Sequence, residues 1–588
     1  MVAIRLFLPS VNGILLRPIQ LRIFDAAHVK RKQLPVGVYY RRRTSALRPA
    51  LRLMPDSNGG LLNDCFSNKC HKKGCAGVLT NGANIFHDPS DESKEMQLAN
   101  ELRLLRLFLS VLFIFGFQHF AVAQSATDSA ETLLRREMRE RRIPGLQAAV
   151  VHRGKIVLLR SFGIADIQHS IPVTNKSIFP INSCTKAFTG VAIMQLVEEG
   201  KIELSAPVSS YLDGLPDTWR AITVRQLLTH VSGLPNILNV LDQNTGKLIG
   251  RETEETAWTK VQAMPLEFAA GQRFSYNQTN YVLLGKIIDK YSGEPFARFF
   301  SERQFQVAGM PNTVFGDSRD VIPNQTPSYR YVRNIDGHAL AEEKLIFAYA
   351  EFPPFRRTAS GLNSTAEDLA HWIIALRKGK LLKTKAALDT LWTAGKYNDG
   401  SPTQWSLGWV TKPRHRHSAI IATGGGRAAF FVYPDADLAV VVLTNLAGAF
   451  PEEFIDELAG FYNPEIPASD PITALRMQLR KRGYEHAIEV YKELRKKDAN
   501  FRPSETDLND WAYRMLNGGG KKREALEIFK LNVFLYPESA NVYDSLAEAF
   551  EAHGERKLAI ENYKRSLELD PNNKNAIRHL KQLVPDYK

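Results

Sequence analysis

The chain has 588 residues, which is too long for one compact domain, so two or three domains are expected. Its hydrophobic fraction of 44% and its charged fraction of 23% are ordinary for a globular protein. The net charge of +14 is uneven, because residues 1–95 contain 15 Lys and Arg against 7 Asp and Glu and hold +8 of it. No basic stripe interleaved with aromatic residues follows, so nucleic acid is excluded as a partner.

Residues 1–95 lack a steady helical or strand periodicity and are predicted to be a disordered or non-native extension. Three of the four cysteines lie here, and His71 follows the second of them. Their C-x4-C-x4-C spacing (Cys65, Cys70 and Cys75) matches no usual zinc pattern and offers no convincing fourth ligand. We therefore predict no metal site and no other cofactor.

Residues 96–123 are predicted to be a secretory signal peptide. Arg103 and Arg106 precede the apolar run Leu107–Phe117, and the small-residue motif Ala121–Ala123 follows. An apolar run of 11 residues is too short to cross a bilayer as a helix, so no stable membrane span is predicted. The alternative interpretation is a buried helix.

A signal peptide leads the nascent chain, so its position favours translation from Met96 and makes residues 1–95 an artefact of the assigned start. The alternative, a genuine extension that begins at Met1, stays open. An exported chain would begin near Gln124 and would keep one cysteine, Cys184, so it would contain no internal disulfide.

The next segment has the patterns of a folded domain. Residues 146–166 predict a β-hairpin, and apolar residues recur at helical spacing over residues 188–200. Residues 428–445 predict a second hairpin, and a helix is expected from Pro451. Strands at both ends with helices between them indicate an α+β fold, with one sheet built from both ends of residues 124–462.

The Pro-rich stretch NPEIPASDP breaks this pattern and predicts a linker over residues 463–475. In residues 476–588 a small residue is followed four positions later by an aromatic one three times, and Pro537 and Pro571 lie 34 residues apart. This pattern resembles tetratricopeptide repeats, which are α-helical hairpins that usually present a concave surface to a protein partner. A purely structural cap is the alternative.

Ser183 and Lys186 lie three residues apart in the stretch INSCTKAFTG. On the first turn of a helix they would share a face, where the helix N-terminus adds a positive potential and free N–H groups. Burial and that potential lower the pKa of a lysine, so that its amine can deprotonate a serine. The alternative is a capping serine followed by an exposed lysine, and the pair alone does not decide between them.

Four further stretches follow in order: ITVRQLLTHVSGLPN, FSYNQTNYVLLGKII, SGLNSTAEDLAHWI and ATGGGRAAFFVYPD. Together with SCTK, they make residues 130–460 closely resemble the serine β-lactamase-like superfamily, which includes class C β-lactamases, D,D-peptidases and related esterases. The resemblance implies an antiparallel sheet flanked by helices plus an all-α subdomain, with the active site between them and a covalent acyl-enzyme. It also favours a bacterial periplasm as the destination, with secretion into the medium as the alternative.

The resemblance assigns Ser183 as the nucleophile and Lys186 as its base or proton shuttle. Tyr276 matches the tyrosine of the family's Y-x-N motif, and its phenol would exchange a proton with the serine and then with the leaving group. The oxyanion hole would use the backbone N–H groups of Ser183 and Gly425.

Two positions depart from the family pattern. Gln278 replaces the asparagine of Y-x-N, and its amide is expected to contact substrate from one methylene further out. The family's third motif, which corresponds to Ala422-Thr423-Gly424 here, begins with a lysine or histidine in relatives and with Ala422 in this chain. Thr423 is assigned to substrate binding. Arg427, three residues past Gly424, could partly replace the missing cation, although a guanidinium that extends from a different position of the chain is not equivalent.

We therefore expect an exported serine hydrolase that acts on a small ester, amide or peptide substrate. Its activity on β-lactams is expected to be weak, because Ala422 carries no charge. The repeats would recruit a protein partner. Two alternatives stay open: a catalytically impaired member that binds peptides or cell-wall fragments, and a scaffold whose main function is the repeat array.

Overall fold

The computed structural model describes residues 126–240, 254–518, 520–585 and 587. The predicted extension, its cysteine cluster and the predicted signal peptide lie outside these residues. All described residues belong to one compact unit of the chain. No helix within the described ranges is long and apolar enough to cross a membrane.

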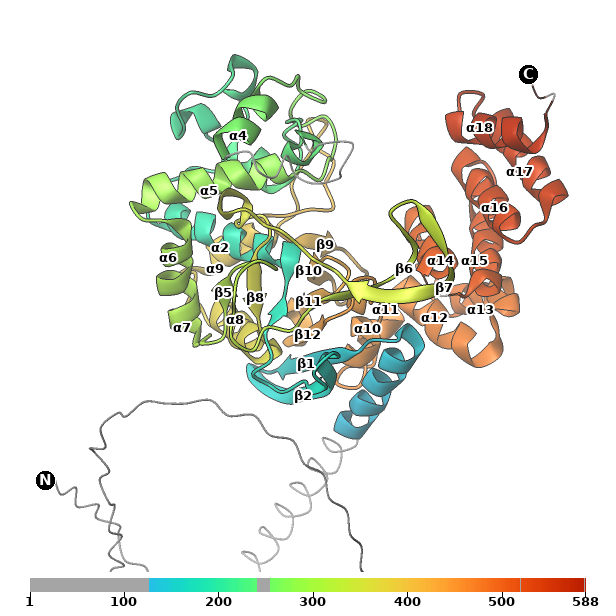
Figure 1. The fold of residues 1–588 in the computed structure, drawn as a ribbon, viewed down its shortest axis with the longest axis horizontal. Coiled ribbons are helices and arrows are strands. Elements are labelled where there is room, and N and C mark those ends of the chain that lie inside the picture. The colour runs from blue at the N-terminus through green and yellow to red at the C-terminus, as the bar shows by residue number, and fades with distance from the viewer. Residues whose placement is uncertain (1–125, 241–253, 519, 586, 588) are drawn as a thin grey trace, which may run out of the picture. The chain divides into compact units, whose positions relative to one another are not determined.

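A seven-stranded antiparallel sheet organises residues 126–462 (Figure 1). Both predicted hairpins are confirmed, and the first strand pairs with the last, so the two ends of this region meet in mid-sheet. These two strands are buried on both faces, which explains their nearly continuous apolar sequences. In spatial order the strands are β3 (Ile171–Pro172), β2 (Lys155–Asp166), β1 (Gly145–His152), β12 (Leu438–Thr444), β11 (Ala428–Tyr433), β10 (Ala419–Gly424) and β9 (Val410–Lys412).

Helices cover both faces of the sheet and form a second subdomain, as the α+β prediction requires. One face packs against a core that includes α2 and α8, and the other against α10 and the helix of residues 126–141. The helices are α2 (Thr185–Glu198), α3 (Val224–Leu228), α4 (Glu254–Gln262), α5 (Gln278–Ser292), α6 (Phe296–Phe300), α7 (Gln306–Ala308), α8 (Ala366–Arg377), α9 (Lys385–Trp392) and α10 (Ile455–Ala459). A three-stranded sheet contains, in spatial order, β4 (Phe179–Pro180), β8 (Leu362–Ser364) and β5 (Val314–Phe315). A two-stranded sheet contains β6 (Tyr329–Ile335) and β7 (His338–Phe347).

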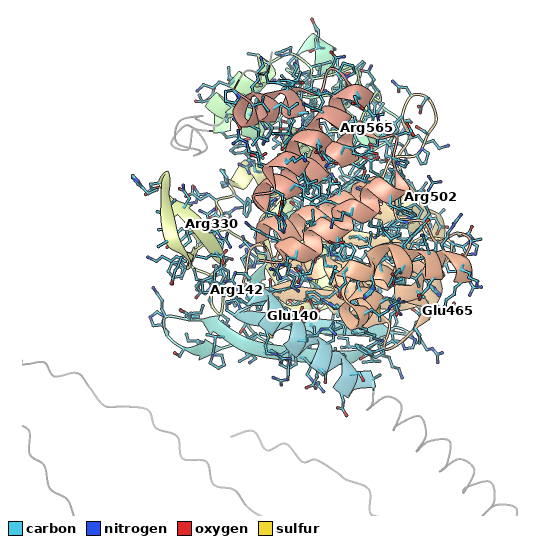
Figure 2. The ribbon with its side chains drawn as sticks, turned by 90° about the vertical axis from the view of Figure 1, so that its right-hand side faces the viewer. Glu140, Arg142, Arg330, Glu465, Arg502 and Arg565 are labelled. Carbon is cyan, nitrogen blue, oxygen red and sulfur yellow. The ribbon has the colours of Figure 1, made fainter. Side chains whose placement is uncertain are left out.

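The C-terminal residues form paired helices around an apolar core of their own. Helices α15 and α17 begin 34 residues apart, and so do α16 and α18, which is the spacing of the predicted repeats. Figure 2 faces these helices, with Arg502 before α14 and Arg565 on α17. The helices are α12 (Pro471–Arg482), α13 (Ala487–Lys497), α14 (Glu505–Gly518), α15 (Lys522–Leu535), α16 (Ala540–Ala552), α17 (Arg556–Leu569) and α18 (Lys574–Leu583).

The segment that we expected to be a linker, residues 463–475, is largely helical instead. It contains α11 (Glu465–Ser469) and the start of α12. Asp470 between them is buried, caps α12 and pairs with Lys412 of β9 at 2.5 Å. The prolines do not break the structure, because Pro471 occupies the first helical turn, where a missing N–H costs nothing. The helical region is therefore fixed directly to the sheet.

Candidate active site

Ser183 lies on a short 3₁₀ turn, Asn182–Cys184, that leads directly into α2, and Lys186 lies on the first turn of that helix. Strand β10 passes so close that a Cβ atom on Gly424 would come within 2.0 Å of a carbonyl oxygen. The same atom would be 3.1 Å from the Ser183 backbone nitrogen, so only glycine fits there. This close approach brings the end of β10 beside the backbone of Ser183, and the oxyanion hole of Ser183 and Gly425 stays a prediction.

Tyr276 is the group that contacts the nucleophile, because its hydroxyl donates to Ser183 Oγ at 2.9 Å. Lys186 is fully buried, and its Nζ donates to Gln278 Oε1 at 3.0 Å and to the Ala359 carbonyl at 2.8 Å. The same Nζ lies 4.7 Å from the centroid of the Tyr276 ring. Among the described residues no hydrogen bond joins Lys186 to Ser183. The lysine is therefore buried behind the tyrosine, which excludes the exposed-lysine alternative.

Gln278 does not have the substrate-facing position that we expected. Its side chain is buried at the start of α5, and its amide oxygen accepts the hydrogen bond from Lys186. The amide therefore orients the lysine. This role could not be inferred from the motif, because it depends on the direction in which the side chain turns after Tyr276.

Thr423 is also separated from the nucleophile, contrary to our expectation. Successive side chains of β10 face opposite sides of the sheet, so Ala422 packs in the core that contains α2 and Thr423 faces away from it. There Thr423 lines a cleft of about 930 Å³ between the β9–β10 edge and the helices α12 and α14. Neither Ser183 nor Tyr276 lines this cleft.

Residues 130–461 match the family model described as Beta-lactamase. The chain belongs to this family. This confirms the β-lactamase-like superfamily that the motifs indicated.

Several known proteins are similar to this family member. Protein flp of Staphylococcus aureus (strain MW2) is 25% identical over 337 residues, which cover 56% of this chain and 65% of flp, less than two thirds of its length. The solved octameric penicillin-binding protein homologue from Pyrococcus abyssi is 24% identical, with a TM-score of 0.49. The match covers 60% of this chain and 81% of the homologue. A penicillin binding protein from Bacillus halodurans is 25% identical, covers 54% and 96%, and has a TM-score of 0.44.

Arg427, the expected substitute for the missing cation, is buried. Its side chain is 5% exposed, and its Nε lies 3.4 Å from the place where a Cβ of Gly425 would stand. No described carboxylate pairs with it, and burial lowers its pKa to about 10, so it stays charged at neutral pH. Arg427 therefore places a buried positive charge beside Gly425.

A second buried guanidinium, Arg356, lies on the turn that contacts Lys186. Its backbone carbonyl accepts from the N–H groups of Ala359 and Ser360 at 3.0 and 3.3 Å, and this places the Ala359 carbonyl that binds the lysine. Burial lowers the pKa of Lys186, the charge of Arg356 lowers it further, and Tyr276 opposes both effects. Burial lowers the pKa of Arg356 to about 10, so this guanidinium stays charged at neutral pH and favours the neutral form of Lys186.

Replacing Arg356 by methionine is expected to move the acid limb of the pH–rate profile to higher pH. Without the neighbouring cation the pKa of Lys186 rises, so a smaller fraction of the amine is neutral. We expect kcat/KM for a short ester to fall on the order of 10-fold at neutral pH and to recover at alkaline pH. Arg356→Lys keeps the charge and should keep most of the native profile. An unshifted profile in the methionine variant would remove Arg356 from the mechanism.

Ser360 is a site residue that our sequence analysis did not single out. Its Oγ lies 3.5 Å from Ser183 Oγ and donates to the Ala359 carbonyl at 2.8 Å. Its stretch, SGLNST, served only to identify the family, and one serine in a loop carries no pattern of its own. Arg356 gave even less signal, because nothing in a sequence marks a single arginine as buried and unpaired.

Proposed function

We propose that the protein is an exported hydrolase that forms an acyl-enzyme on Ser183 and prefers esters, or amides without an essential carboxylate, over β-lactams. The observation that carries the proposal is the 2.9 Å contact between the Tyr276 hydroxyl and Ser183 Oγ, with buried Lys186 behind the ring. Export to a periplasm or to the medium rests on the signal-peptide pattern of residues 96–123.

In the proposed acylation, the Tyr276 phenol passes its proton to the neutral amine of Lys186. Ser183 Oγ then attacks the substrate carbonyl carbon, and its proton passes to the Tyr276 phenolate oxygen in contact with it. The lowered pKa of Lys186 favours its neutral amine, which supplies the basicity behind the phenol. The tetrahedral oxyanion forms against the N–H groups of Ser183 and Gly425, next to the positive charge of Arg427. Collapse returns the proton to the departing alkoxide or amine, and water then releases the acid through the same groups.

The proposed preference for esters follows from where positive charge lies. Ala422 is uncharged and Arg427 is buried, so neither residue offers an exposed cation to a substrate bound at Ser183. A β-lactam antibiotic carries a carboxylate beside its reactive amide, and a charge-assisted hydrogen bond to that group is lost here. A simple ester does not depend on such a contact.

Turnover of a short acyl ester beside a chromogenic cephalosporin tests the proposal. We expect kcat/KM to be higher for the ester than for the cephalosporin, because only the cephalosporin loses a charge-assisted hydrogen bond, a contact worth about 30-fold. Ser183→Ala should lose both hydrolysis and labelling by a fluorophosphonate. A preference for the cephalosporin would contradict the ester proposal, and absence of Ser183-dependent labelling would favour the catalytically impaired binding protein.

The proposed role of the repeats is to bind a protein partner, and it rests on the resemblance of these helices to such arrays. The cleft of about 930 Å³ lies between the helices and the sheet, with Arg502 and Asp510 among its lining residues. Charges deeper in the cleft are paired, as Arg414 is with Asp456 at 2.7 Å. Partner binding stays a prediction.

A further inference from the structure

An aromatic cluster surrounds the tyrosine that contacts the nucleophile. The buried His230 lies at its centre, with ring centroids 4.6 Å from Tyr276, 4.9 Å from Trp405 and 5.9 Å from Phe274. The Trp405 ring also lies 5.5 Å from Tyr276 and 6.0 Å from Phe274. Phe274, Tyr276 and Trp405 therefore form one continuous layer on the histidine, which we call the aromatic shelf.

His230 holds this layer in place through the backbone on both sides of Tyr276. Its carbonyl accepts from the Ser275 N–H at 2.9 Å, and its Nδ1 accepts from the Asn277 N–H at 3.0 Å. Burial keeps the pKa of His230 well below its usual value, so the ring stays neutral. The shelf is therefore a fixed surface without a formal charge.

Part of the aromatic shelf is open to solvent. Phe274 is 38% exposed, Tyr276 is 36% exposed and Trp405 is partly exposed. Adjacent apolar rings in contact with water are favourable places for an apolar ligand, because covering them releases that water. The shelf begins at the Tyr276 hydroxyl, 2.9 Å from Ser183 Oγ, so a ligand that covers it lies next to the reacting bond.

We infer that the aromatic shelf binds a flat, uncharged, apolar ring carried by the leaving group of the substrate. This inference rests on the proposed function, in which Tyr276 returns a proton to the leaving group, so that group lies on the Tyr276 side. Phe274 and Trp405 then offer ring faces and edges for stacking. An anionic group would lose its hydration there without gaining a partner.

Methyl, benzyl and cyclohexylmethyl acetate test the inference, with the full chain and acid release followed in a pH-stat. The three esters share one acyl group and have alcohols of similar acidity, so they differ mainly in what they place on the shelf. We expect kcat/KM for benzyl acetate to be about 10-fold above that for methyl acetate, mainly through KM, with the non-planar cyclohexylmethyl ester between them. Phe274→Ala should reduce the benzyl-to-methyl ratio to about 2, and Phe274→Tyr, which keeps a ring, should preserve it.

Tyr349→Ala is the matched control, because it removes an aromatic ring that is 75% exposed outside the shelf and should leave the ratio unchanged. A benzyl-to-methyl ratio of kcat/KM near 1 in the native protein would overturn the inference. So would a high ratio that survives Phe274→Ala.

Binding without turnover separates this inference from the proposed function. Ser183→Ala protein should give saturation-transfer NMR signals from the ring protons of benzyl acetate, and adding Phe274→Ala should remove them. If no acetate is hydrolysed but these signals behave as expected, the proposed function fails and the shelf stands. Signals that persist in the double variant would overturn the shelf whatever the turnover shows.

Discussion

Lys186→Met is expected to abolish hydrolysis while leaving the protein folded. We expect kcat/KM for a short ester to fall by at least about 10³-fold, because Lys186 supplies the only amine behind the Tyr276 ring among the residues that the structure describes. Initial rates across pH measure the loss, which should persist at every pH. Lys186→Arg should be inactive too, because a guanidinium keeps its proton and the mechanism needs a neutral amine.

The stability of the same variant shows whether the loss is chemical. Lys186 is a buried amine whose hydrogen-bond acceptors are an amide and a carbonyl oxygen, so methionine removes the cost of taking a polar amine out of water. It also leaves those two oxygens without a donor, which offsets the gain. We expect the free energy of unfolding to stay within about 1 kcal/mol of the native value. An inactive variant that is much less stable, or an active Lys186→Arg variant, would contradict this account of the lysine.

Local patterns were sufficient to predict much of the fold. The two hairpins, the helix after Ser183 and the spacing of the C-terminal helices each depend on residues close together in sequence, and all are present. The burial of Lys186 was also predicted, because several ordered motifs supported the interpretation of the Ser–Lys pair.

Features that depend on distant residues were not predicted. Gln278 turns inward to a lysine 92 positions away, and Arg356 approaches the same lysine from a loop far along the chain. The prolines near residue 470 indicated a linker, because nothing local shows that Asp470 will pair with Lys412 of the sheet. Such contacts are set by the folded arrangement and leave no periodic signal in the sequence.

One buried carboxylate connects the helical repeats to the sheet region. Glu137, on the helix of residues 126–141, is fully buried and pairs with Arg136 at 3.0 Å, Arg141 at 2.8 Å and Arg480 of α12 at 2.7 Å. Burial alone would raise its pKa, but Arg141 and Arg480 hold the value down at about 2. The interaction therefore depends on an ionised carboxylate among three cations.

Glu137→Ala is expected to lower the free energy of unfolding by about 3 kcal/mol, because three arginines lose their shared, fully buried counterion and keep only the less buried Glu457 and Glu453. Urea unfolding of the full chain, followed by circular dichroism, measures the change. Glu140→Ala is the matched control on the same helix. Glu140 is 34% exposed and contacts Lys521 at 3.2 Å, so its removal should cost no more than about 1 kcal/mol.

The stabilisation by Glu137 should also disappear in acid. Its pKa is about 2 in the folded protein against a usual 4.5, so the ionised form favours folding. This contribution is complete above pH 4.5 and is lost as the pH falls from 4.5 through about 2, and its full size is about 3 kcal/mol. The difference in unfolding free energy between native and Glu137→Ala protein should therefore shrink between about pH 5 and pH 3, whereas the Glu140→Ala difference should not. A difference that stays constant would show that the ionised form of this carboxylate does not stabilise the attachment of the repeats to the sheet region.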